Sequence, residues 1–128
     1  MKKIKVASSS FTNLEKSYRN LERSIGAPVT EPRDLSGIIK DFEMVYELSG
    51  NVLKKFLESE GLQTSGPKDV FTRAFQSGYI SDESIWLAMI NDRNHAAHVY
   101  DAGEAQKIVD RIRNDYVGLV KKTFDFVP

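Results

Sequence analysis

The only two histidines of this 128-residue chain lie three positions apart in one polar segment, DRNHAAHVYD, at residues 92–101. Arg93 and Asn94 precede them, and Tyr100 follows His98 by two residues. Arginine offers phosphate a planar fork of donors, and histidine exchanges a proton near neutral pH. These residue types could hold a nucleotide phosphate. They could also cleave RNA without a metal, by moving the proton of a ribose 2′-hydroxyl that attacks the adjacent phosphate.

A continuous helix would not present Arg93 and His98 to one ligand. At about 100° per residue, five positions place the two side chains about 140° apart. They can converge if the helix ends near Ala97 and turns His98 back, or if a second copy of the chain brings its own motif across. The motif therefore requires either a helix end near Ala97 or a second chain.

Structural roles for the same residues compete with these chemical ones. A histidine near a helix C-terminus, such as His95, commonly complements the helix dipole or donates to a free carbonyl. Arg93 stands between two polar residues and could be a solvated surface side chain. Two histidines three apart can also suggest a metal site, but no third ligand with suitable spacing is obvious. We therefore expect neither a metal nor a cofactor.

Composition limits the classes of function. Lysine and arginine total 18, as do aspartate and glutamate, so the formal net charge is zero. Strong non-specific nucleic-acid binding usually requires a large basic excess, so contact with RNA or a nucleotide must be local or shared with a partner. The chain has no cysteine, no apolar signal segment after its basic start, and no apolar run near the ~20 residues of a membrane span. We expect a cytoplasmic, single-domain protein (residues 1–128) that does not contact membranes.

The apolar spacing predicts helices and no strand. Helices are expected at residues 10–25, 35–60, 68–76, from about 83 into the motif, and 104–126, while residues 1–9 fray. Asp34 is the expected N-cap of the second helix, whose wide apolar stripe should pack against two neighbours. Gly50 within that helix suggests a close helix crossing. The prediction is an all-α fold, a four-helix up-and-down antiparallel bundle with one short extra helix.

The string RNHAAHVY, residues 93–100, resembles the signature of the HEPN superfamily. That signature is an arginine, a polar residue, a short spacer and a histidine, followed in one branch by a tyrosine two residues later. Residues 41–61, 66–80 and 85–101 are similar to successive segments of the nucleotidyltransferase substrate-binding proteins, a HEPN subfamily. Family members often carry a tryptophan and a lysine shortly after a Tyr-Glu-Leu element. Here Tyr46, Glu47 and Leu48 are followed by Ser49-Gly50-Asn51, so Glu47 matches and could face Arg93.

The resemblance implies a homodimer whose two motifs share one cleft, and a cognate minimal nucleotidyltransferase as partner. It assigns nucleotide or substrate binding to Arg93, Asn94, His98 and Glu47. Three functions remain open. The first, which we favour, is a nucleotide- or substrate-binding subunit of a two-component, toxin–antitoxin-like system. The second is a metal-independent endoribonuclease toxin, with Arg93 and His98 as catalytic residues and Tyr100 as the acceptor of a silencing AMP. The third is a helical interaction module whose motif is a relic.

Overall fold

The computed structural model describes residues 9–98 and 101–126, and within these ranges it is helical without strands. Its helices are α1 (Ser9–Gly26), α2 (Pro32–Ser59), α3 (Pro67–Gln76), α4 (Glu83–Ala96), α5 (Ala102–Arg111) and α6 (Val117–Phe124). A π-helical segment, η1 (Ile112–Tyr116), joins α5 to α6, so these three elements form one long helix. The predicted all-α class is confirmed.

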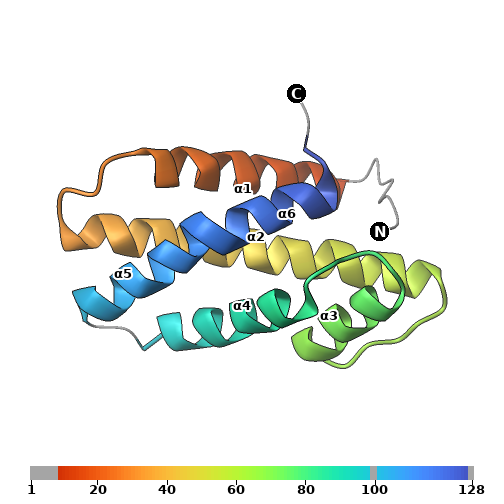
Figure 1. The fold of residues 1–128 in the computed structure, drawn as a ribbon. Coiled ribbons are helices and arrows are strands. Elements are labelled where there is room, and N and C mark those ends of the chain that lie inside the picture. Colours follow the sequence, from red (N-terminus) through yellow and green to blue (C-terminus); the bar gives the residue numbers. More distant parts are fainter. Residues whose placement is uncertain (1–8, 99–100, 127–128) are drawn as a thin grey trace.

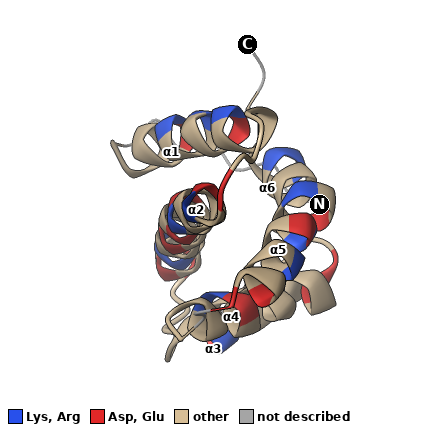
Figure 2. Ribbon diagram, turned by 90° about the vertical axis from the view of Figure 1, so that its left-hand side faces the viewer, with Lys and Arg blue, Asp and Glu red and all other residues tan. Residues whose placement is uncertain are grey.

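Four long helices form an up-and-down antiparallel bundle (Figure 1). They are α1, α2, α4 and the α5–η1–α6 helix, while the short α3 lies beside one end of α2. The central helix, α2, packs against α1, α3, α4 and α5. Its apolar stripe therefore serves more neighbours than the two expected from the sequence. Seen end-on, the helices lie around one hydrophobic core cluster, and charged positions occur along several of the helices (Figure 2).

Aromatic side chains connect the helices at the centre of the bundle. The rings of Phe42 on α2 and Tyr116 on η1 are stacked, with centroids 5.3 Å apart. The rings of Phe71 on α3 and Trp86 on α4 lie 5.1 Å apart. Burying such large apolar surfaces supplies most of the folding free energy of a domain this size.

Helix α2 begins earlier than the sequence suggested. The expected N-cap, Asp34, is the third residue of the helix, and the N-cap is Glu31. Proline is well tolerated at the first helical position because that N–H would lack a helical partner anyway, so Pro32 starts the helix instead of delaying it. Asp34 then accepts hydrogen bonds from the backbone N–H groups of Thr30 (2.9 Å) and Glu31 (3.1 Å).

The expected close crossing at Gly50 is wrong. A Cβ at this position would meet nothing within 4 Å, so no neighbouring helix requires a glycine there. Gly50 instead lines an open pocket between α2, α3 and α4. That pocket contains most of the predicted site.

Candidate functional site

Helix α4 positions the motif. Its buried face consists of Trp86, Met89 and Asp92, and Arg93 comes next in sequence at the edge of that face, where it is half-buried. The helix ends at Ala96, and the backbone N–H of His98 donates to the carbonyl of His95 at 2.9 Å. A helix end near Ala97, one of the two arrangements that the motif required, is therefore present.

Asp92 fixes this end of α4 to the long C-terminal helix. Its carboxylate accepts hydrogen bonds from Arg111 Nε at 2.8 Å and Nη2 at 2.7 Å, and from the hydroxyl of Tyr116. Hydrogen bonding to Asp92 raises the pKa of the Arg111 guanidinium. Burial, and then the bond to Asp92, raises the pKa of the Tyr116 hydroxyl. The residue next to Arg93 is thus held by two side chains from another helix.

The sequence interpretation missed this role and treated Asp92 only as a flank of the motif. A signal was present, because Asp92 follows Met89 by three residues and Trp86 by six. That spacing continues the inward face of α4, and a carboxylate on such a face needs buried donors.

A pocket of about 430 Å³ lies beside Arg93, between α2, the start of α3 and α4. Its volume is within the usual range for sites that bind small molecules. Its polar side chains are Glu47, Asn51, Lys54, Thr64, Arg93 and Asn94. The other lining residues are Tyr46, Gly50, Gly66, Pro67, Val70 and Phe71.

The guanidinium of Arg93 lines this pocket. Among the described residues, no hydrogen bond or ion pair engages its guanidinium, and Glu47 lines the pocket without pairing with it. The positive charge of Arg93 nevertheless affects the pKa of Tyr46 on α2. Burial raises the pKa of Tyr46, and the charge of Arg93 partly opposes that rise. An unpaired guanidinium facing a pocket is available to bind an anion.

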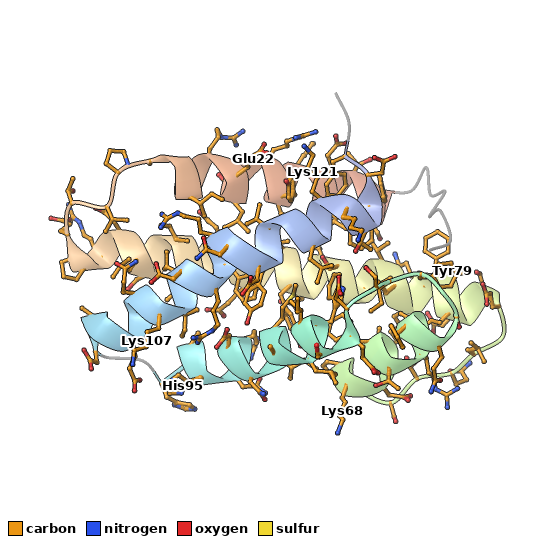
Figure 3. The ribbon with its side chains drawn as sticks, viewed as in Figure 1. Glu22, Lys68, Tyr79, His95, Lys107 and Lys121 are labelled. Carbon is orange, nitrogen blue, oxygen red and sulfur yellow. The ribbon has the colours of Figure 1, made fainter. Side chains whose placement is uncertain are left out.

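The two histidines lie away from this pocket. His98 is exposed in the turn after α4 and does not line the pocket with Arg93. His95 extends outward from the end of α4 (Figure 3). Its Nε2 lies 2.9 Å from Glu104 in the first turn of α5, which favours a structural role. Tyr100 lies outside the described residues.

A second hollow, of about 610 Å³, lies where the start of α2 meets the end of α4 and the start of α5. Its charged side chains are Arg33, Lys40, Glu43 and Asp101, so positive and negative groups balance. None of the predicted site residues that the structure describes lines it. It is therefore a weaker candidate for an anionic ligand than the pocket beside Arg93.

Comparison with known proteins identifies the family of this chain. Residues 9–127 match the family described as nucleotidyltransferase substrate binding protein like. The chain belongs to this family. The resemblance read from the motif and the segments before it is confirmed.

One curated relative and two solved structures extend the comparison. The chain is 35% identical over 83 residues to a Haemophilus influenzae protein named probable ribonuclease HepT. The match spans 61% of this chain and only 57% of that protein. A crystal structure of a Thermus thermophilus protein has a TM-score of 0.80 at 28% identity, covering 88% of this chain and 96% of that one.

The second structure is a Haemophilus influenzae protein described as revealing the fold of a substrate binding domain of a nucleotidyltransferase. It has a TM-score of 0.79 at 26% identity, covering 90% of this chain and 96% of the other. Among the described residues, no helix combines the length and the hydropathy needed to cross a membrane.

Proposed function

We propose that this protein is a helical nucleotide- or substrate-binding subunit that pairs with a minimal nucleotidyltransferase in a two-component, toxin–antitoxin-like system. Family membership supports the nucleotidyltransferase partner. The zero net charge supports a role that depends on a partner, because the chain has no basic excess for binding nucleic acid alone.

One observation carries the proposal. Arg93, Asn94 and Glu47, which the sequence singled out from two separate segments, line the same pocket. Arg93 contributes donors for phosphate, Asn94 contributes both a donor and an acceptor, and Glu47 can accept from hydroxyl groups. A ligand with phosphate and hydroxyl groups suits this set.

The experiment is co-expression with a tagged minimal nucleotidyltransferase of the same organism, followed by size-exclusion chromatography with light scattering. A stable complex of the two proteins is expected, and Arg93→Ala should leave that complex intact because it changes a pocket and not a surface. If the two proteins elute separately at micromolar concentrations, the pairing is refuted.

A homodimer completes the proposal. Leu87 and Ile90 on α4 are only half-buried, and Met44 on α2 is 53% exposed, so apolar surface remains uncovered beside the pocket. A second copy packed there could bring its His98 toward the Arg93 of the first. This arrangement would answer the 140° separation predicted from the sequence.

The second candidate function is a metal-independent endoribonuclease. The complete set of Arg93, His98 and Tyr100 favours it, and so does the name of the 35% identical relative. His98 would accept the proton of the ribose 2′-hydroxyl as that oxygen bonds to phosphorus, and would return a proton to the 5′-oxygen as its bond to phosphorus breaks. Arg93 would neutralise charge on the phosphate. AMP added to Tyr100 would place a second phosphate and a bulky base beside these groups and so silence cleavage.

This candidate is tested by RNA cleavage with purified variants. His98→Ala and Arg93→Ala should each lower the rate by roughly 10²–10⁴-fold, and the double variant should add little because the two act as a unit. His95→Ala is the control, and an equal loss from it would contradict the assignment. Incubation with the transferase and ATP should add one AMP by intact mass, and Tyr100→Phe should abolish that increase.

A further inference from the structure

We propose that the pocket beside Arg93 binds a single nucleoside phosphate. In this arrangement the cationic side chains of Arg93 and Lys54, which line the pocket, attract the phosphate, and the base lies over Gly50 against the apolar residues of the lining. The inference rests on the proposed function, since it names the ligand class for a nucleotide- or substrate-binding subunit. It adds Lys54, Gly50 and Thr64 to the residues that the sequence had indicated.

Two cationic side chains line the pocket. Lys54 on α2 and Arg93 on α4 both line it, and neither has an ion pair with another described residue. Helix α3 also begins there, with Gly66 as an N-cap at φ 88° that has no capping side chain. The N-terminus of a helix carries free N–H groups and a partial positive charge. Asp69 in the first turn of α3 is paired with Arg73, so among the side chains that line the pocket two cations face the single carboxylate of Glu47, and the pocket favours an anion.

The apolar part of the pocket lining suits a flat apolar group. Tyr46, Val70 and Phe71 line it while remaining at most 8% exposed, so they form a fixed surface. Gly50 leaves the space above that surface empty, because a Cβ there would meet nothing within 4 Å. A nucleobase can occupy such a slot, which a side chain at position 50 would fill.

Polar groups for the edges of a base and for a sugar are also present. The hydroxyl of Thr64 is buried and has no hydrogen-bond partner among the described residues, although such groups are normally satisfied. The amides of Asn51 and Asn94 offer both donors and acceptors, and the exposed Glu47 can accept from ribose hydroxyls. A phosphate, a base and a sugar therefore each find matching chemistry in one pocket.

Isothermal titration calorimetry of the purified full chain tests the ligand class. The probes are AMP, GMP, CMP and UMP, with adenosine and inorganic phosphate as half-ligands and a four-nucleotide RNA as the polymer. At least one nucleoside monophosphate should bind about tenfold more tightly than either half-ligand, because both ends contribute. An RNA that binds about tenfold more tightly than every mononucleotide would overturn the proposal in favour of a strand site.

Two variant pairs test the location. Gly50→Leu fills the slot and should weaken nucleotide binding by about tenfold or more, whereas Gly37→Leu places the same side chain elsewhere on α2 and should not. Both glycines are helical and free of neighbours, so folding is affected alike. Lys54→Ala should also weaken binding, whereas Lys122→Ala on α6 should leave it unchanged. Unchanged affinity in both Gly50→Leu and Lys54→Ala would overturn the proposal.

Complex formation with the nucleotidyltransferase is measured on the same samples. If the wild-type protein forms no complex with the nucleotidyltransferase, the proposed function is refuted. Nucleotide affinity that depends on Gly50 and Lys54 would still support this site. Intact pairing without nucleotide affinity refutes the site and leaves the proposed partner standing. The two failures are therefore distinguishable.

Discussion

Asp92 is 7% exposed and accepts three hydrogen bonds, two from Arg111 and one from Tyr116. Asp92→Asn removes the negative charge and replaces one acceptor oxygen with a donor that faces other donors. The free energy of unfolding should fall by about 2 kcal/mol. This is less than for a fully buried ion pair, because the Arg111 side chain is 43% exposed to water. Urea unfolding measures the change.

The control for Asp92→Asn is Asp110→Asn. Asp110 also accepts a side-chain hydrogen bond, from Gln106 at 2.9 Å, but it is exposed. Its loss should cost less than about 0.5 kcal/mol. Equal costs for the two variants would show that Asp92 does not anchor α4.

Tyr116 gives the anchor a dependence on pH. Its raised pKa means that the folded chain keeps the hydroxyl proton to higher pH than the unfolded chain does. This contribution to stability is complete below about pH 10, the ordinary tyrosine value, and is lost as the pH rises from there toward the folded pKa. Above pH 10 the unfolding free energy of the wild type should fall more steeply than that of Tyr116→Phe, by up to about 1.4 kcal/mol per pH unit.

Other tyrosines do not confuse that comparison. The pKa values of Tyr18 and Tyr46 are also raised, with burial as the first cause, but both residues remain in the variant. Their effects cancel when the two unfolding curves are subtracted. Parallel curves above pH 10 would contradict the prediction.

Residue-level prediction went furthest where spacing along one helix decides the geometry. The helix end at Ala96 is one of the two arrangements that angles along a single helix required. Arg93, Asn94 and Glu47 line one pocket, and their roles stay predictions. Lys54 and Thr64 could not be found in this way, because their place in the pocket depends on how three helices pack. Whether Arg93 and His98 act together also stays a prediction, because His98 does not line the pocket with Arg93.

Helix α2 contains two glycines, Gly37 and Gly50, that no neighbour requires. Alanine is favoured over glycine inside a helix by about 1 kcal/mol, because glycine loses more backbone entropy on folding. Gly37→Ala and Gly50→Ala should therefore each raise the free energy of unfolding by about 0.5–1 kcal/mol. Thermal or urea unfolding checks both.

If Gly50→Ala lowers stability and Gly37→Ala does not, a neighbouring helix does pass close to Gly50, as the sequence suggested. A different glycine supplies the contrast, because Gly61 after α2 has a φ of 80°. Alanine is strained in that left-handed conformation, so Gly61→Ala should destabilise the protein.

The long C-terminal helix shows why element boundaries were easier to predict than element geometry. The apolar spacing predicted a helix over residues 104–126, and α5, η1 and α6 cover 102–124. Arg111 and Tyr116 are five residues apart, which on an α-helix would separate them by about 140°. In η1 the N–H of Val117 donates to the carbonyl of Ile112, the i→i+5 pattern of a π-helix. That pattern brings residues five apart toward one side, where both reach Asp92.

At the scale of the whole molecule, the bundle could be predicted because every long segment carries one apolar face. Five helical segments joined by short or moderate loops leave few compact arrangements other than antiparallel neighbours. The number of helices that pack against α2 was underestimated, because an apolar stripe in the sequence shows how wide the buried face is and not how many helices share it. How copies of the chain assemble depends on surfaces that periodicity does not report.

The uncovered apolar surface near the pocket predicts that the protein is a homodimer. Met44 precedes Glu47 by three residues and Asn51 by seven, so it lies on the side of α2 that lines the pocket. A large apolar side chain that is 53% exposed there suits burial against a second copy, and a zero net charge opposes association little.

Light scattering after size exclusion should give twice the 14.5 kDa of one chain. Met44→Lys should shift this mass toward one chain, while Val29→Lys in the loop between α1 and α2 should not. A wild-type monomer at micromolar concentrations would remove the shared cleft, and with it the route by which His98 of one copy reaches Arg93 of another.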